Sequence, residues 1–275
     1  MKKLLHGIKN IKRKLESCMS EKKKYFVVSD IHSFFYKMMA ALEEKGFEKD
    51  DLNHILCVCG DLFDRGDESK QLFEFVKELN VQGRLIYIKG NHEDLLQDCV
   101  REIYAGRMPG RHHFSNGTIK TICMLCGQSE WIVYDPTWRD KICETMQPVL
   151  DFINENCVDY AEIGDYIFVH GWIPSFSHLD DFRDGDDDDW RQARWWNGMD
   201  MWINPSNRVE GKTIVCGHWH CSWGWSHIRM QRKEWPQVNK KDWKESFEPF
   251  IDEGIIAIDA ATASTGIVNV LVIEE

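Results

Sequence analysis

The sequence lacks the stretches that usually separate domains, because no segment is rich in proline, glycine and serine together. It also lacks an internal repeat and any apolar run long enough to cross a bilayer. The basic first segment, residues 1–24, has no apolar core of the kind that marks a secretory signal. These absences predict a single domain over residues 25–275, with no transmembrane segment.

Positive charge is scarce, since 34 lysines and arginines stand against 45 aspartates and glutamates, for a net charge of −11. General nucleic-acid binders normally carry a basic face, so we expect no nucleic-acid partner. This balance leaves room for a phosphorylated substrate, because bound metal ions add positive charge that the sequence does not count.

Ten cysteines are scattered along the chain. In a chain of this size without a secretory signal they indicate reduced thiols and a cytoplasmic location. Cys123 and Cys126 form a lone C-x-x-C pair, with no second pair at zinc-finger spacing. We interpret these two as helix-packing residues, and zinc binding as the weaker alternative.

Residues 1–24 carry apolar side chains at helical spacing between many lysines, namely Leu4, Leu5, Ile8, Ile11 and Leu15. This pattern predicts an amphipathic helix. We favour a helix packed on the domain or a frayed end. Peripheral membrane contact is the weaker alternative, because one short apolar stripe is a poor anchor.

Short apolar runs alternate with helical patterns in the first hundred residues. The apolar runs predict strands over 25–29, 55–59 and 85–88. The helical patterns predict helices over 33–45, 69–79 and 93–104. This alternation is typical of an α/β fold with parallel strands joined by crossover helices.

The second half of the chain returns to strands after a mixed segment over 105–160, which we interpret as an insert or a helical flank. The strands are predicted over 166–169, 213–216, 254–258 and 267–273. The last two look like a hairpin with a turn around residues 264–266.

Five of these predicted strands end in polar residues that can bind metals. The segments are Asp30-x-His32, Gly60-Asp61-x-x-Asp64-Arg65-Gly66, Gly90-Asn91-His92-Glu93, His170-Gly171 and Gly217-His218-Trp219-His220. Each is weak alone, because a histidine after a strand is more often packed or solvated than a ligand. Five such endings are hard to explain by chance, and ligands of α/β sheets bind at the carboxyl ends of strands.

Carboxylate, imidazole and amide groups suit divalent ions such as Mn²⁺, Zn²⁺ and Fe²⁺. We expect Asp61 to bridge two ions, because it follows a central strand. Asp30 and His32 would hold the first ion, since residues two apart at a strand end share a face. Two ions about 3.5–4 Å apart can clamp the attacking and leaving oxygens of a phosphoryl group. The second ion would be held by Asn91, His170 and His218.

These segments resemble the calcineurin-like metallophosphoesterases, and within them the phosphoprotein phosphatase branch with its motifs G-D-x-x-D-R-G and G-N-H-E. The resemblance runs from about Tyr25 onward and includes Ile258-Asp259, which is similar to the family's closing I-D-T-G segment. It implies a four-layer α/β/β/α sandwich of two packed mixed β-sheets flanked by helices. It also implies two divalent metal ions at one edge, with Mn²⁺ as our first choice and Fe, Zn or Mg as alternatives.

The same resemblance implies catalytic roles. Arg65 would bind the substrate phosphate, with Asn91 beside it, and His92 would protonate the leaving oxygen while Asp64 orients it. Arginine offers a planar fork for phosphate oxygens, and a His–Asp pair gives an oriented imidazolium suited to neutral pH. A surface salt bridge for Arg65 and a turn role for Asp64 are the alternatives, which rank lower because both residues lie inside the matched motif.

Two positions depart from the pattern of the phosphatase branch. His220 fits the G-H-x-H pattern of the broader metallophosphoesterases, where a second histidine binds the first metal. We include His220 as a metal ligand, with lining of the site as the alternative. Ala260 and Ala261 stand where the family has a Thr-Gly pair.

A segment rich in tryptophan and aspartate, around residues 172–250, is interpreted as a cap on the domain. Tryptophan clusters most often serve packing, and a substrate wall for stacking is the sharper alternative. Arg194 is predicted as a second phosphate contact, with a surface role as an equal alternative. The acidic run Asp180–Asp189 is expected to be a solvated loop that would favour basic peptides if it borders the site.

We therefore predict a dinuclear-metal-dependent phosphoesterase that hydrolyses phosphomonoesters by in-line attack of a metal-bridging hydroxide. The first substrate class is phosphoserine or phosphothreonine in protein, and a small phosphorylated molecule is the other kind of partner. The alternative is a dinucleoside polyphosphate hydrolase acting on diadenosine tetraphosphate, which shares these motifs. A non-catalytic module that keeps the fold would have lost a ligand or the general acid, and none is missing here.

Overall fold

The computed structural model describes residues 22–229 and 245–275 of the chain. The helix expected over residues 1–24 falls outside these ranges except for residues 22–24, and Lys24 already begins the first strand. Within the described ranges, every helix is too short or too polar to cross a bilayer.

A first sheet of five strands has the order β10-β1-β2-β3-β4. Its strands are β1 (Lys24–Val28), β2 (His54–Cys59), β3 (Leu85–Ile88), β4 (Cys157–Val158) and β10 (Leu271–Glu274). Strands β1 to β4 are parallel, and β10 pairs antiparallel with β1 so that Tyr25 faces Ile273. The sheet is therefore mixed, with its parallel strands directed toward one edge.

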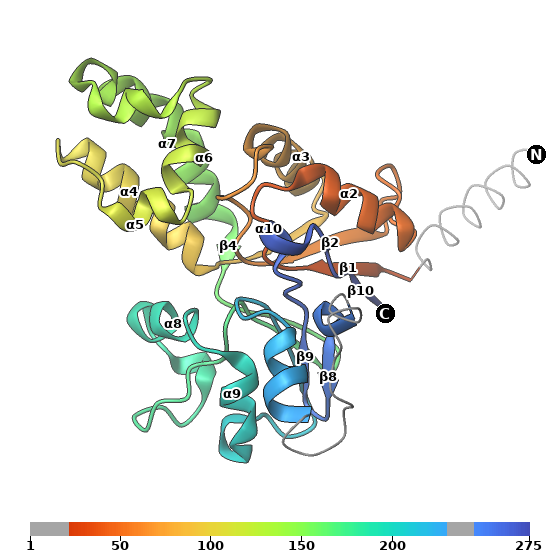
Figure 1. Ribbon diagram of the computed structural model, residues 1–275. Helices are drawn as coiled ribbons and strands as arrows, with labels where there is room; N and C mark the ends of the chain where they lie inside the picture. Colours follow the sequence, from red (N-terminus) through yellow and green to blue (C-terminus); the bar gives the residue numbers. More distant parts are fainter. Residues whose placement is uncertain (1–21, 230–244) are drawn as a thin grey trace, which may run out of the picture.

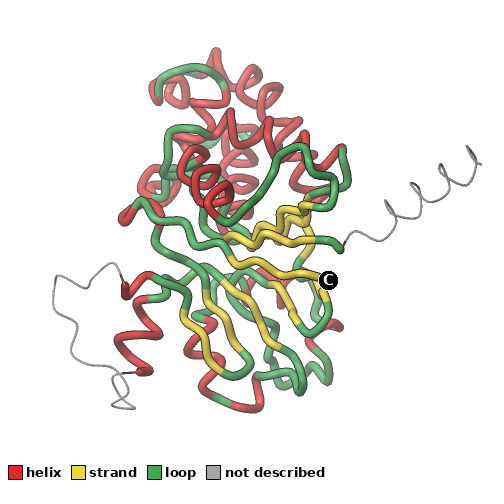
Figure 2. The backbone as a smooth tube through the Cα atoms, turned by 90° about the vertical axis from the view of Figure 1, so that its right-hand side faces the viewer, coloured by secondary structure: helices red, strands yellow, loops and turns green. Residues whose placement is uncertain are grey.

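A second sheet of five strands has the order β5-β6-β7-β9-β8. Its strands are β5 (Ala161–Ile163), β6 (Tyr166–Phe168), β7 (Thr213–Cys216), β8 (Phe250–Asp252) and β9 (Ile255–Ala257). Strands β6, β7 and β9 are parallel, whereas β5 and β8 run antiparallel to their neighbours. Figure 2 shows the two sheets facing each other across the middle of the molecule.

Alternating side chains along the strands build three separate cores, as expected from the period of two in a strand. Val27 and Cys57 of the first sheet pack with Phe168 and Val215 of the second, in the core between the sheets. The opposite face of the first sheet packs on helices through residues such as Phe26. The opposite face of the second sheet has its own core.

Helices cover both outer faces, so the predicted α/β/β/α sandwich is confirmed (Figure 1). The first sheet is covered by α2 (Phe35–Glu44), α3 (Ser69–Val81), α4 (Asn91–Tyr104), α5 (Arg111–Ser115), α6 (Thr118–Leu125) and α7 (Arg139–Asn156). The second sheet is covered by α8 (Asp187–Ala193) and α9 (Gly198–Ile203). Cys123 of α6 is a buried free thiol in the first helical core, in agreement with a packing role.

The expected hairpin between the last two strands is wrong. Strand β9 belongs to the second sheet and β10 to the first, and the short helix α10 (Thr262–Thr265) lies between them. The partner of β9 in a true hairpin is β8, whose Ile251 faces Ile256. The length of a short connection in the sequence does not distinguish a turn within one sheet from a crossing between two sheets, because a few residues suffice for either.

Candidate metal centre and active site

The predicted ligands lie just after parallel strands of both sheets, in loops or at the start of a helix. Asp30 and His32 follow β1, Asp61 follows β2, and Asn91 is the first residue of α4 after β3. From the second sheet, His170 follows β6 and His218 follows β7. The carboxyl edges of the two sheets therefore meet at this place, as is usual for ligand sites of α/β sheets.

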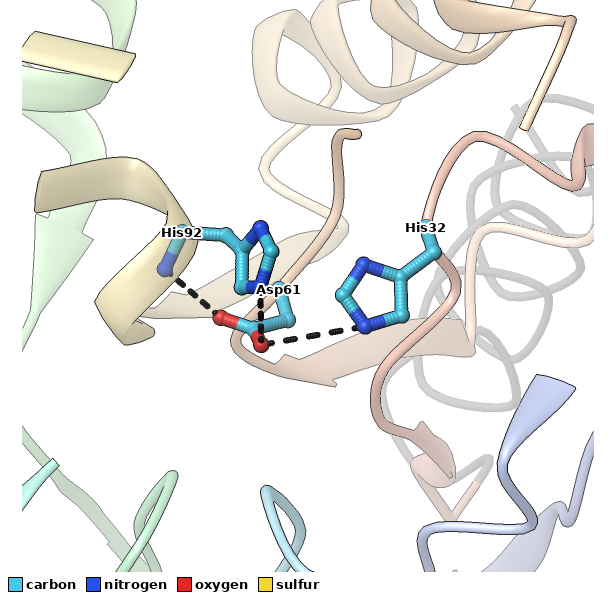
Figure 3. A group of neighbouring side chains, drawn as sticks. All are labelled: His32, Asp61 and His92. Carbon is cyan, nitrogen blue, oxygen red and sulfur yellow. Dashed lines mark hydrogen bonds and ion pairs between the residues drawn. The ribbon is translucent and has the colours of Figure 1, made fainter. Parts of the chain in front are cut away.

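Asp61 lies at the centre of this cluster. Its Oδ2 atom is 3.8 Å from Nε2 of His32 and 3.8 Å from Nε2 of His92 (Figure 3). Its Oδ1 atom is 3.3 Å from Nε2 of His170. Two groups of side chains could each hold a metal ion, and both contain Asp61: His32–Asp61–His92 and Asp61–His170–His218.

Two further predicted ligands stand beside the second group. The Asn91 side-chain oxygen is 2.8 Å from Nε2 of His170. The Asp30 carboxylate accepts the backbone N–H of His218 at 2.9 Å and the Ser29 hydroxyl. The Asp30 carboxylate thus contacts the backbone of the loop that carries His218, and its shared role with His32 at the first ion stays a prediction.

Backbone carbonyls orient two of the histidines. Nδ1 of His170 donates to the carbonyl of Cys59 at 2.8 Å, and Nδ1 of His32 to the carbonyl of Phe63 at 3.0 Å. Each bond fixes the ring so that Nε2 faces the cluster. Such partners are the usual means by which proteins hold the tautomer of a metal-binding histidine.

Backbone strain is concentrated at the same place. Left-handed φ values cost free energy in residues other than glycine. Such residues are found mostly at functional sites, where the surrounding contacts hold the backbone in the strained conformation. Eight non-glycine residues of the described chain adopt such values, and six of them are predicted site residues: Asp30, His32, Asp61, Asp64, Arg65 and His218. The turns after the strands are therefore held against their own preference so that several side chains point to one centre.

Glu93 holds the loops of Asp61 and Gly90 together through hydrogen bonds. The residue lies in the G-N-H-E motif, but the sequence alone does not indicate this role. Its buried carboxylate accepts the backbone N–H groups of Asp61 at 3.0 Å and Gly90 at 2.7 Å. It also accepts from the N–H of Leu62 and the hydroxyl of Tyr87. A side chain at Gly90 would collide with the Asp61 carboxylate, so the glycine is needed for this close approach.

A second constellation lies at the side of the cluster. Nδ1 of His92 donates to Asp64 at 2.7 Å, and Nε2 of His92 lies 3.2 Å from the Arg65 guanidinium. Burial would lower the pKa of His92, but the carboxylates of Asp61 and Asp64 outweigh it and raise that pKa to about 9. Arg65 is exposed, so its guanidinium is open to an incoming group.

The cluster carries buried negative charge that calls for a cation. Burial raises the pKa of Asp61 to about 7 and that of Asp30 to about 6. Burial and the neighbouring His170 lower the pKa of His218 to about 2, so this ring stays neutral. Neutral imidazoles with buried carboxylates form a donor set that fits divalent metal ions.

The Arg194 guanidinium is engaged by two carboxylates, and its predicted phosphate contact stays a prediction. Its guanidinium is buried and pairs with Asp94 of α4 at 2.8 Å and with Asp159. His220 is exposed, contacts Ser222 at 2.6 Å, and belongs to neither group of candidate ligands. The Trp219 N–H donates to the carbonyl of Gly217 in a tight turn around His218, and metal binding by His220 stays a prediction.

The tryptophan-rich segment mainly serves packing. Trp172, Trp190 and Trp202 are buried in the core of the second sheet. Trp195 differs, because it is 49% exposed and its ring lies edge-on to His218 at 5.8 Å. The acidic run is not simply a solvated loop, since Asp186 caps the N-terminus of α8.

Known proteins share these features in part. A tetraphosphatase from Bacillus velezensis, bis(5'-nucleosyl)-tetraphosphatase PrpE [asymmetrical], is 34% identical over 74 residues, which are 25% of this chain and 30% of that protein. The chain therefore spans about a third of the length of this curated relative.

Two solved structures are also similar. A protein serine/threonine phosphatase of Saccharomyces cerevisiae has 18% identity and a TM-score of 0.48, over 73% of this chain and 62% of that one. A cold-active protein tyrosine phosphatase of Shewanella has 14% identity and a TM-score of 0.48, over 92% and 75%. The model of one family, the calcineurin-like phosphoesterases, matches residues 23–249. The chain thus belongs to the calcineurin-like phosphoesterase family.

Proposed function

We propose that this protein is a dinuclear-metal-dependent phosphoesterase that hydrolyses phosphomonoesters. One observation carries the proposal: Asp61 is shared by two groups of potential metal ligands, and the His92–Asp64–Arg65 constellation lies beside them. The first ion would be held by His32 and Asp61, and the second by Asp61 together with Asn91, His170 and His218. Asp30 would join His32 and Asp61 at the first ion. We propose Mn²⁺ as the metal, with Fe, Zn or Mg as alternatives.

Bound divalent ions would supply a water nucleophile at neutral pH and positive charge for the phosphoryl oxygens. The remaining steps belong to side chains of this chain. Arg65 binds phosphate oxygens through its planar guanidinium. His92 holds a proton on Nε2 and gives it to the leaving oxygen, while Asp64 keeps the ring in place through Nδ1.

Arg65 and His92 are coupled in this scheme. An Arg65 N–H that donates to Nε2 of His92 requires the neutral ring, whereas the raised pKa of His92 favours the protonated ring. Protonation breaks that hydrogen bond. Both groups then become donors that face the same substrate, Arg65 to the phosphate and His92 to the leaving group.

Phosphoserine or phosphothreonine in a protein is the first substrate class of the proposal. A dinucleoside tetraphosphate is the second candidate. The name of the Bacillus relative and the half-exposed Trp195 ring next to His218 favour this candidate, because an exposed indole can stack on a nucleobase. The free thiols of the described cysteines support a reducing compartment such as the cytoplasm.

A panel of metals against substrates tests the proposal. Metal-free protein is loaded with Mn²⁺, Fe²⁺, Zn²⁺ or Mg²⁺ and assayed on a phosphoserine peptide, on p-nitrophenyl phosphate and on diadenosine tetraphosphate. We expect activity that is lost with chelator and restored by metal. Higher kcat/KM on diadenosine tetraphosphate would select the second candidate, and no turnover of any phosphate ester with any metal would reject the proposal.

A further inference from the structure

The first turn of helix α6 lies against the turn that carries Asp64 and Arg65. This helix belongs to the helical segment between β3 and β4 of the first sheet, and no predicted site residue lies on it. We propose that its residues Gly117, Thr118, Lys120 and Thr121, called here the α6 clamp, position Asp64 and Arg65 for catalysis. The inference rests on the proposed function, because it assigns these residues a role in proton donation by His92.

Two threonines hold the Asp64 carboxylate. The Thr118 hydroxyl donates to Oδ2 at 2.8 Å, and the Thr121 hydroxyl donates to Oδ1 at 2.9 Å. Oδ2 also accepts from Nδ1 of His92 at 2.7 Å. Within residues 22–229 and 245–275, no lysine or arginine forms an ion pair with this fully buried carboxylate, so neutral donors fix its direction.

Thr121 also holds the backbone of the same residue. Its hydroxyl oxygen accepts the N–H of Asp64 at 3.0 Å while it donates to the side chain of Asp64. Asp64 has a left-handed φ of 77°, which is unfavourable for an aspartate. One hydroxyl thus bridges both ends of a strained residue and prevents it from relaxing away from His92.

Arg65 is fixed by the rest of the clamp. The Lys120 ammonium donates to the carbonyl of Arg65 at 2.8 Å and pairs with Asp67 at 2.7 Å. Gly117 approaches so closely that a Cβ atom there would lie 2.4 Å from the Arg65 nitrogen. The backbone of Arg65, from which its exposed side chain extends, is therefore held at its carbonyl by Lys120 and enclosed at its nitrogen by Gly117.

Packing alone does not account for these threonines. The other buried residues of α6, such as Ile119 and Ile122, contribute to the core between the helices. Thr118 and Thr121 are equally buried, and residues three apart lie on one face of a helix. A buried hydroxyl costs free energy unless it is hydrogen-bonded, and here both hydroxyls bond to the partner of the general acid.

Substrates with different leaving groups can show whether the α6 clamp positions the catalytic residues or only stabilises the fold. If the clamp orients Asp64 so that His92 can donate its proton, loss of a hydroxyl slows only those substrates whose leaving oxygen needs a proton. Alkyl phosphates such as phosphoserine need that proton. p-Nitrophenyl phosphate does not, because nitrophenolate is a stable anion.

The experiment uses the metal-loaded full chain with Thr118→Val and Thr121→Val, and His92→Ala as the reference. On a phosphoserine peptide we expect kcat to fall about 10- to 100-fold in each valine variant, which is part of the roughly 10²- to 10⁴-fold that a positioned general acid contributes. KM and metal content should stay close to wild type. On p-nitrophenyl phosphate kcat should be nearly unchanged, and Thr118→Ser and Thr121→Ser should restore the rate on the peptide.

Ile122→Val on the same helix is the matched control, because it loosens the core without touching Asp64. If the valine variants slow both substrates by one common factor, as this control would, the clamp has only a structural role. If His92→Ala itself shows no dependence on the leaving group, both the general acid and the positioning that serves it are rejected. Should a valine variant not fold, the alanine variant is compared with the serine variant in the same way.

Discussion

Nε2 of His170 lies 3.3 Å from Oδ1 of Asp61, although the histidine follows a strand of the second sheet and the aspartate a strand of the first. The candidate metal centre is therefore a junction between two sheets. Each sheet alone carries only part of the ligand set, so the metal ions would act as a bond across the interface.

Asp61→Asn tests whether one residue serves both ions. An amide has half the acceptor capacity of a carboxylate and no charge, and both groups of ligands share this side chain. We expect activity to fall to background and both ions to be lost or strongly depleted, as measured by elemental analysis of the purified protein. Exposed Asp50→Asn is the control, and retention of two ions in Asp61→Asn would contradict the shared role.

The affinity for metal should depend on pH through the carboxyl groups. In the metal-free protein burial raises the pKa of Asp61 to about 7 and of Asp30 to about 6, and burial lowers the pKa values of His32 and His170. The histidines are then already neutral, and binding must displace protons from the carboxyls. Affinity for Mn²⁺, measured by titration calorimetry, should fall as the pH drops through 7 to 6. A flat affinity across this range would show that the carboxyls are not ligands.

Glu93→Gln should weaken the support of the Asp61 and Asn91 loops. The glutamine amide places hydrogens where Glu93 accepts backbone N–H groups, which leaves buried donors unpaired. We expect a loss of about 1–3 kcal/mol in the free energy of unfolding by urea, together with weaker metal binding. Tyr87→Phe removes a single bond to Glu93 and should cost no more than about 1 kcal/mol. Equal free energies of unfolding of Glu93→Gln and Tyr87→Phe would contradict the role of Glu93 in holding the two loops.

Arg194→Met separates a structural role from phosphate binding. Arg194 is buried between Asp94 and Asp159, so its removal leaves the buried Asp94 carboxylate with Lys89 alone as its charged partner. We expect a loss of about 3 kcal/mol in the free energy of unfolding, with an unchanged KM for phosphate esters. The matched control is Arg191→Met, whose pairing with Asp98 is exposed and worth less than about 1 kcal/mol. A raised KM without a loss of stability would restore the original prediction.

Ala261→Gly should stabilise the protein. Ala261 has a φ of 52°, a left-handed conformation that glycine adopts without the penalty of about 1–2 kcal/mol that a Cβ imposes. The family pattern has glycine here, so the strain belongs to this chain. Thermal melts should show a higher Tm for Ala261→Gly. The control Ala260→Gly, at a buried position without a positive φ, should lower it.

The sequence predicts the strands and the ligands well because both depend on local patterns. The apolar runs predict strands over 85–88 and 213–216 with the observed bounds, and a residue of the cluster follows each strand within three positions, Asn91 after the first and His218 after the second. The periodicity of a strand and the chemistry of the residue after it are both visible within a few positions.

Contacts between distant segments could not be predicted in this way. Arg194 looks free in the sequence, but its partner Asp94 lies 100 positions away. Thr118 and Thr121 look like ordinary helix residues, and only their distance to Asp64 reveals a role. His220 matches a pattern of the broader family, yet only the structure shows that it is exposed and contacts Ser222.

Strand β10 pairs with β1, although it is synthesised almost 250 residues after β1. On the ribosome β1 would have an unpaired edge during nearly the whole of synthesis. That edge is a template for pairing with other nascent chains, so we expect yield in cells to depend on chaperones that shield it.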